Sequence, residues 1–157
     1  MDDGFPVLYK QRRIGLNNSI FWVYKFRSMK TNIPDIPTHL LDNQESFYIR
    51  CGTLLRTFSI DELPQLINII KGEMVFIGPR PALHNQDDLA KLRTKVGVHK
   101  LMPGVTGWAQ INGRDKLSIP EKVQFDEYYL INRSIILNIK ILFLTVLKVI
   151  KFQGVSH

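Results

Sequence analysis

Residues 60–71 carry the pattern that most constrains how this chain can fold. Apolar side chains recur there at helical spacing, at Leu63, Leu66, Ile67 and Ile70. The pair Asp61-Glu62 begins this segment and Gly72 follows it, as expected at the two ends of a helix. Ser59 and Glu62 match a capping box if Ser59 is the N-cap, whereas Pro64 fits the first turn of a helix that begins at Asp61. Both alternatives place Asp61 in or beside the first turn.

A stiff turn with an arginine at its centre follows this helix. Residues 74–77 are a short apolar run, and residues 78–81 read Gly-Pro-Arg-Pro. Proline fixes its own φ and restrains the residue before it, so Arg80 lies between two rigid positions. A guanidinium held in this way can bind a phosphate through two hydrogen bonds at a low ordering cost. The alternative is a surface arginine without a role, and the pattern favours neither.

Composition fits one globular domain over residues 1–157. The chain is 45% hydrophobic, and its 21 Lys and Arg against 14 Asp and Glu give a net charge of +7. Such a charge attracts nucleic acid, an anionic membrane face or phosphorylated substrates, and charge alone does not choose among them. No nucleic-acid-binding motif is present, so nucleic acid is not expected as a partner. Cys51 is the only cysteine, which excludes an internal disulfide. The N-terminus lacks the pattern of a secretory signal.

The remaining pattern predicts a mostly helical α+β domain with a small sheet. Strands are expected at 5–9 and 20–28, with a basic turn region at 11–18 between them. Residues 31–46 should form a loop with a short helix, and residues 102–114 a turn, a short apolar segment and a second turn. Further helices are expected at 86–95 and 119–130.

The last predicted helix, residues 134–152, is strongly apolar and amphipathic. One side of its helical wheel holds Asn138, Lys140, Thr145, Lys148 and Lys151. The opposite side holds Ile135, Ile139, Phe143, Val146 and Ile150. This pattern is typical of a helix in a membrane interface, and equally of a core helix with its lysines in water.

Several residues could carry phosphate chemistry. An ionised Asp61 at a positive helix end could attack phosphorus or hold Mg²⁺, although acidic residues there are usually caps. Glu62 is open to the same alternatives: a cap, a metal ligand or a base. Strand alternation puts Lys25 and Arg27 on one face, where they could line an anion site. Further candidates for that site are Arg56 and Arg114.

Five motifs occur in one order along nearly the whole chain. They are Lys-Phe-Arg-Ser-Met at 25–29, Asp-Glu-Leu-Pro-Gln-Leu at 61–66, Lys-Gly-Glu-Met at 71–74, Gly-Pro-Arg-Pro at 78–81, and Pro-Gly-Val-Thr-Gly-Trp-Ala-Gln-Ile-Asn-Gly-Arg at 103–114. In this the chain resembles the bacterial sugar transferase family, the monotopic polyprenyl-phosphate phosphoglycosyl transferases.

The resemblance implies a Mg²⁺-dependent enzyme at the cytoplasmic face of the bacterial inner membrane. Such enzymes move a sugar-1-phosphate from a UDP-sugar to undecaprenyl phosphate, which starts an O-antigen, capsule, exopolysaccharide or glycoprotein glycan. By motif position Asp61 is the nucleophile and Glu62 its partner in metal or proton handling. Arg80 should bind phosphate, with Lys25, Arg27, Arg56 and Arg114 as secondary anion-site candidates. Membrane contact would involve the C-terminal helix, and a homodimer is an assembly to test.

The chain departs from the family pattern at two places. Family members carry an apolar re-entrant helix before the segment where this sequence begins, and the sequence starts after it. In addition, Asn138 stands where the family usually has an aspartate. The alternative to an active transferase is therefore a catalytically poor remnant that binds a nucleotide-sugar or a partner glycosyltransferase.

Overall fold

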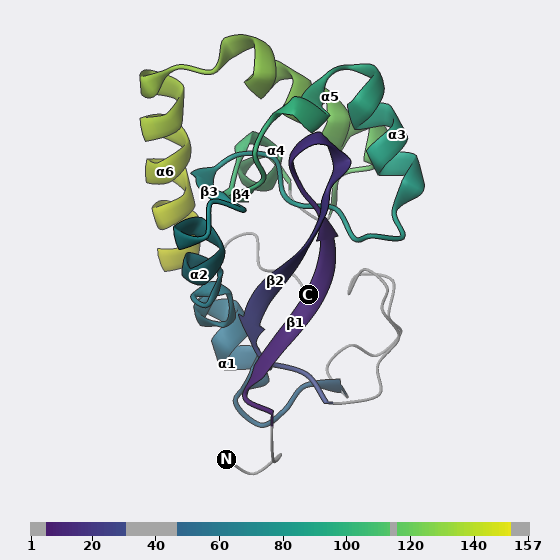
Figure 1. Ribbon diagram of the computed structural model, residues 1–157. Helices are drawn as coiled ribbons and strands as arrows, with labels where there is room; N and C mark the ends of the chain where they lie inside the picture. The colour runs from purple at the N-terminus through teal and green to yellow at the C-terminus, as the bar shows by residue number, and fades with distance from the viewer. Residues whose placement is uncertain (1–5, 31–46, 114–115, 152–157) are drawn as a thin grey trace.

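A computed structural model describes residues 6–30, 47–113 and 116–151 of the chain. Within these ranges the fold is α+β with more helix than strand, as predicted. A long two-stranded hairpin runs through the molecule, and the helices gather beside it and at its turn end (Figure 1). A second, very short sheet lies near the centre of the helical part. The predicted loop and short helix at 31–46 fall outside the described residues.

The hairpin consists of β1 (Leu8–Ile14) and β2 (Ile20–Phe26), which pair antiparallel. The prediction of β2 is confirmed, whereas the prediction of a basic turn over residues 11–18 is wrong for its first four residues. These residues pair with β2 as the second half of β1, because a full-length aromatic partner strand lies opposite them. The reversal itself is confined to residues 15–19, where Asn17 and Asn18 take positive φ angles of 51° and 61°.

The predicted helix over residues 60–71 is divided into two parts. A 3-10 turn, η4 (Ile60–Glu62), leads into α2 (Gln65–Ile70), and Pro64 is the N-cap of α2. The short helix α1 (Gly52–Thr57) precedes them. Ser59 has a φ of 55° and its side chain makes no cap hydrogen bond, so the predicted capping box is wrong. Gly72 ends α2 as predicted, with a φ of 73°.

The apolar stripe of α2 faces outward instead of forming the core. Its exposed fractions run from 42% at Ile67 to 87% at Ile70. The buried side of α2 is polar, because Asn68 is fully enclosed and holds the helix to the hairpin. Asn68 accepts a hydrogen bond from the backbone N–H of Tyr24 at 3.1 Å and donates to the carbonyl of Trp22 at 2.7 Å. Two backbone groups of β2 are thus satisfied by one side chain.

The short sheet brings the predicted strand at 74–77 to the segment beyond residue 102. Here β3 (Val75–Ile77) pairs parallel with β4 (Gly104–Thr106). The helices predicted at 86–95 and 119–130 are confirmed as α3 (Asp87–Lys95) and α5 (Ile119–Asn132). Between them lie η5 (Val98–Lys100) and α4 (Trp108–Ile111). Within the described residues, the buried apolar side chains form three clusters and not one continuous core.

The C-terminal helix α6 (Ile135–Ile150) is confirmed, and its apolar side faces outward. Ile141 is completely buried, but Ile135, Ile139 and Phe143 are 78%, 63% and 61% exposed. The partly buried side of the helix carries polar residues, among them Thr145 and Lys148. Of the two predicted alternatives, this arrangement disfavours the core helix with its lysines in water, because the apolar side is exposed and Lys148 is partly buried. No helix among the described residues is long and apolar enough to cross a membrane.

Candidate functional site

The Gly-Pro-Arg-Pro turn is fixed at both ends by backbone hydrogen bonds from distant strands. The carbonyl of Pro79, just beyond β3, accepts a hydrogen bond at 2.9 Å from the N–H of Gly104 in β4. The carbonyl of Ala82 accepts from the N–H of Ile14 at 2.9 Å, at the end of β1. Prolines stiffen the turn from within, and these bonds fix its position against both sheets.

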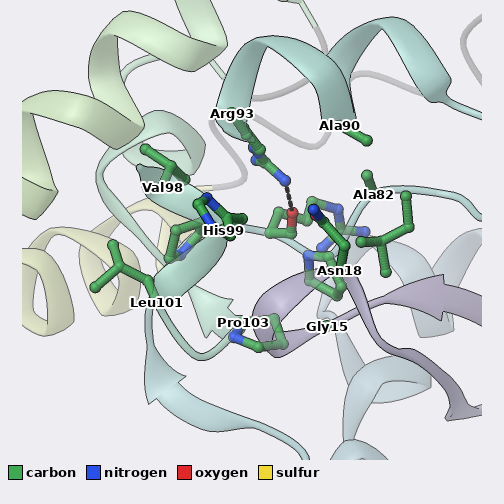
Figure 2. Close-up of a pocket in the computed structure, with 13 residues that line it drawn as sticks. Gly15, Asn18, Ala82, Ala90, Arg93, Val98, His99, Leu101 and Pro103 are labelled. Carbon is green, nitrogen blue, oxygen red and sulfur yellow. Dashed lines mark hydrogen bonds between the residues drawn. The ribbon is translucent and has the colours of Figure 1, made fainter. Parts of the chain in front are cut away.

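Two arginines hold the carbonyls at the middle of the same turn. Arg93 of α3 donates from Nη1 to the carbonyl of Arg80 at 2.8 Å (Figure 2). Arg13 of β1 donates from Nη1 to the carbonyl of Pro81 at 3.0 Å. Arg93 is itself held by Asp126 of α5, whose Oδ2 accepts from its Nε at 3.0 Å and its Nη2 at 2.6 Å. A buried ion pair thus lies directly behind the backbone of Arg80.

Glu62 joins two of the predicted cations. Its Oε1 accepts from Nζ of Lys25 at 3.1 Å and from Nη2 of Arg80 at 3.0 Å. The side chains are largely buried, with exposed fractions of 10% for Glu62, 17% for Lys25 and 26% for Arg80. The structure therefore brings together three site residues that lie far apart in the sequence.

Asp61 is buried beside this group, with an exposed fraction of 7%. Burial raises the pKa of the Asp61 carboxyl, and the negative charge of Glu62 adds to the rise. Lys25, and more weakly Arg56 and Arg80, act in the opposite direction. Asp61 lies in a single 3-10 turn, so the neighbouring cations are the groups that favour its ionised form.

Lys25 lies within this cluster, and its surroundings change its pKa. Burial lowers the pKa of Lys25 to about 8, and the positive charges of Arg80 and Arg13 contribute to the lowering. The carboxylates of Glu62 and Asp61 partly offset the effect. A lysine in this state titrates close to physiological pH, so its charge depends on what binds next to it.

The remaining predicted cations have different surroundings. The guanidinium of Arg56 lies 5.1 Å from the ring centroid of Tyr48 and donates from Nη1 to Sδ of Met29 at 3.2 Å. Arg27 follows β2, where its backbone N–H donates to the carbonyl of Val7 at 2.8 Å, and its role in phosphate binding stays a prediction. Arg114 lies outside the described residues.

Sequence reasoning missed four residues around the site: Arg13, Arg93, Asp126 and Lys148. Arg13 falls in the predicted turn over residues 11–18, although it alternates with Gln11 as residues of a strand do. Arg93 and Asp126 lie in the confirmed helices α3 and α5, and a charged residue on the apolar side of each helix was the available signal. Lys148 belongs to the polar arc of the predicted C-terminal helix, and that arc alone does not mark it as a site residue.

A groove opens beside Glu62 and Arg80. Its cavity volume is about 260 Å³, and it lies between η4, α2, β4 and α6. Polar and apolar side chains both line it. The polar ones include Thr106, Gln110, Thr145 and Lys148, and the apolar ones include Leu63, Leu66, Phe76, Val105, Ile111 and Val149. A ligand with a charged head and an apolar body matches this mixed lining.

A smaller cavity of about 30 Å³ lies behind the turn (Figure 2). Arg93, His99 and Pro103 are among its lining residues. Its size suits ordered water and not a substrate. This cavity therefore belongs to the support of the turn and is separate from the groove.

The residue that departs from the family pattern has a structural partner. Oδ1 of Asn138 accepts a hydrogen bond from the hydroxyl of Tyr129 at 2.9 Å, which links α6 to α5. The same hydroxyl lies 3.4 Å from the carbonyl of Ile77 at the end of β3. An amide oxygen accepts this bond as a carboxylate would, so the Asn preserves the link between the two helices.

The carboxylates present could hold a divalent cation only together with a ligand. No group of three or more His, Cys, Asp or Glu side chains with metal-site geometry occurs in the described ranges. Mg²⁺ typically takes one or two carboxylates together with substrate phosphate oxygens and water. Asp61 and Glu62 fit that requirement if a diphosphate supplies the remaining oxygens.

Comparison with known proteins gives a consistent result. The family model described as bacterial sugar transferase matches residues 1–152. The chain is 44% identical over 156 residues to the uncharacterized sugar transferase EpsL of Bacillus subtilis, covering 98% of this chain and 75% of that protein. It is 41% identical over 150 residues to the UDP-glucose:undecaprenyl-phosphate glucose-1-phosphate transferase of Escherichia coli.

Coverage differs among these relatives. The Escherichia coli match covers 91% of this chain but 32% of that enzyme. The undecaprenyl-phosphate galactose phosphotransferase of Salmonella typhimurium is 34% identical over 168 residues, covering 97% of this chain and 35% of the enzyme. The chain thus spans about a third of these larger enzymes. Because the family model covers nearly all of it, the chain belongs to the bacterial sugar transferase family.

Proposed function

We propose that this protein transfers a sugar-1-phosphate from a UDP-sugar to undecaprenyl phosphate and so initiates the synthesis of a polysaccharide. The observation that carries the proposal is the buried pair Asp61 and Glu62 surrounded by Lys25 and Arg80. The names of the relatives support the same donor and acceptor classes. The sugars in those names are glucose, galactose and N-acetylgalactosamine, and the sugar used here is left open.

The proposed reaction has two steps. In the first, a carboxylate oxygen of Asp61 attacks the β-phosphorus of the UDP-sugar. The bond from that phosphorus to the bridging oxygen breaks, and UMP leaves with the bridging oxygen and its electron pair. In the second, a phosphate oxygen of the lipid attacks the phosphosugar, and the bond to Asp61 breaks. The products are the lipid diphosphosugar and the regenerated carboxylate.

The surrounding charges suit these steps. Lys25 and Arg80 can neutralise the diphosphate and the charge that develops on the leaving oxygen. Glu62 positions both cations through its Oε1. The fixed turn keeps the Arg80 backbone in one place, so little reorganisation accompanies catalysis. Asp61 and Glu62 would hold Mg²⁺ together with substrate phosphates, and the ion would add further charge neutralisation.

The exposed apolar surfaces support action at the cytoplasmic face of the inner membrane. The outward sides of α2 and α6 contain Ile70, Ile135 and Ile136, with exposed fractions of 87%, 78% and 80%. Surfaces of this kind are unusual on a protein that stays in water, and they suit a bilayer interface. An acceptor held in the membrane requires the enzyme to approach that surface.

The test uses the full chain in detergent with Mg²⁺ and a panel of UDP-glucose, UDP-galactose and UDP-N-acetylgalactosamine. At least one donor should release UMP and add the mass of a phosphosugar to a peptide that contains Asp61. Asp61→Asn should abolish both signals, while the exposed control Asp87→Asn should retain them. If no donor releases UMP, the alternative of a binding remnant is favoured. A mass gain on a peptide without Asp61 would reject the proposed nucleophile.

A further inference from the structure

Lys148 occupies an unusual place on α6. The helix exposes its apolar residues, and Lys148 lies on the opposite, partly buried side. One turn earlier, Oγ1 of Thr145 lies 2.7 Å from Oγ1 of Thr106 in β4, which fixes this part of the helix against the short sheet. Lys148 then lines the groove that also contains Glu62 and Arg80. A cation on the inner side of such a helix faces the site and not the membrane surface.

The groove combines this cation with an apolar wall. Leu63, Leu66 and Phe76 line it and remain 53%, 45% and 58% exposed. Glu62 contributes a negative charge, but its Oε1 is already held by Lys25 and Arg80. The groove thus combines the cations Lys148 and Arg80 with apolar side chains, of which Leu63 and Leu66 belong to the exposed apolar stripe over residues 63–70. A UDP-sugar has no long apolar part to cover that wall.

Building on the proposed function, we propose that this groove is the acceptor site, with Lys148 as the residue that binds the phosphate of the polyprenyl phosphate. The first isoprene units lie along Leu66 and Phe76 and lead toward the bilayer. Arg80 stands at the junction of the donor and acceptor phosphates. This placement brings the lipid phosphate beside Glu62, next to Asp61 in the chain. Lys148 thereby acts in the second step and is not needed for the first.

The two steps can be measured separately. Single-turnover UMP release without acceptor reports the first step, and acceptor-dependent turnover reports the second. Lys148→Ala should leave the first rate within about twofold and raise the KM for undecaprenyl phosphate at least about tenfold, the usual loss for one charged contact. The matched control is Lys151→Ala, an exposed lysine at the end of the same helix. If general attraction to the membrane were responsible, both variants would lose activity equally.

The apolar wall has its own test. Leu66→Gln changes a half-exposed side chain, so the fold should tolerate it. It should raise the KM for undecaprenyl phosphate several-fold and leave the KM for methyl phosphate, an acceptor without isoprene units, within about twofold. Lys148→Ala should weaken both acceptors, since both carry the phosphate.

Direct binding separates this proposal from the proposed function. Undecaprenyl phosphate is titrated into the Asp61→Asn variant in detergent, where no transfer takes place. Adding Lys148→Ala to that variant should raise the Kd at least about tenfold, and this comparison holds whether or not UMP release is ever observed. The acceptor site is rejected if Kd is unchanged, if Lys148→Ala slows acceptor-free UMP release, or if it matches Lys151→Ala. Absence of UMP release from the unaltered chain would count against the proposed function alone.

Discussion

The protein should lose much of its stability when only one partner of the buried pair Arg93 and Asp126 is changed. Asp126 is 1% exposed and accepts two hydrogen bonds from the guanidinium of Arg93. Asp126→Asn keeps the size of the side chain but leaves the Arg93 charge buried without its counter-ion. Breaking such a pair costs about 3–5 kcal/mol. Because a single amide oxygen can still accept both bonds, as Oδ2 does now, we expect the lower end, about 3 kcal/mol.

Urea unfolding followed by tryptophan fluorescence measures this difference. Asp87→Asn, an exposed change at the start of α3, is the control and should shift the free energy of unfolding by about 0.5 kcal/mol or less. Replacing both partners, with Arg93→Met and Asp126→Leu, should recover most of the loss, since no buried charge then remains. The reasoning is refuted if Asp126→Asn is as stable as the control, or if the double variant is no more stable than the single one.

Three further predictions concern Lys25, Gly104 and Gly72. The folded protein loses the Lys25 proton near pH 8 and the unfolded chain near 10.5, so the unfolded state binds more protons between these values. Relative to Lys25→Met, the free energy of unfolding should therefore rise over this window, by up to about 3 kcal/mol, in urea melts at several pH values. A Cβ at Gly104 would overlap the backbone nitrogen of Gly78, so Gly104→Ala should lose at least about 3 kcal/mol or fail to fold. Gly72→Ala meets no atom and has only its φ of 73° to strain it, so thermal melts should show a loss of about 1 kcal/mol.

The sequence predicted element types better than it predicted which face each element buries. Helices α3, α5 and α6 and strand β2 follow from periodicity and end signals that depend only on neighbours in the chain. The outward orientation of Ile70 on α2 and Ile135 on α6 was not visible, because an apolar stripe is the same whether it faces a core or a membrane. For α2, the hydrogen bonds of Asn68 determine which side of the helix is buried. The backbone partners of Asn68 lie in β2, more than forty residues earlier.

For the site, the motifs predicted that Asp61, Glu62, Lys25 and Arg80 act together, and the structure places them around one another. Their electrostatic state could not be predicted, because burial depends on the packing of the whole domain. The supporting residues Arg93 and Asp126 lie in helices that carry no motif. Asp126 holds Arg93, and Arg93 donates to a backbone carbonyl, which any residue type would present, so no local sequence signal marks the contact.

The Gly-Pro-Arg-Pro turn takes its hydrogen bonds from β1, α3 and the start of β4, which lie on three separate stretches of the chain. A partly folded chain that lacks any one of them would have the proposed catalytic residues but not their geometry. In hydrogen-exchange terms, the amides of Ile14 and Gly104 should open only together, with the global unfolding of the domain. Catalytic competence in this protein is therefore all-or-none: it should disappear at the same denaturant concentration as the fold itself.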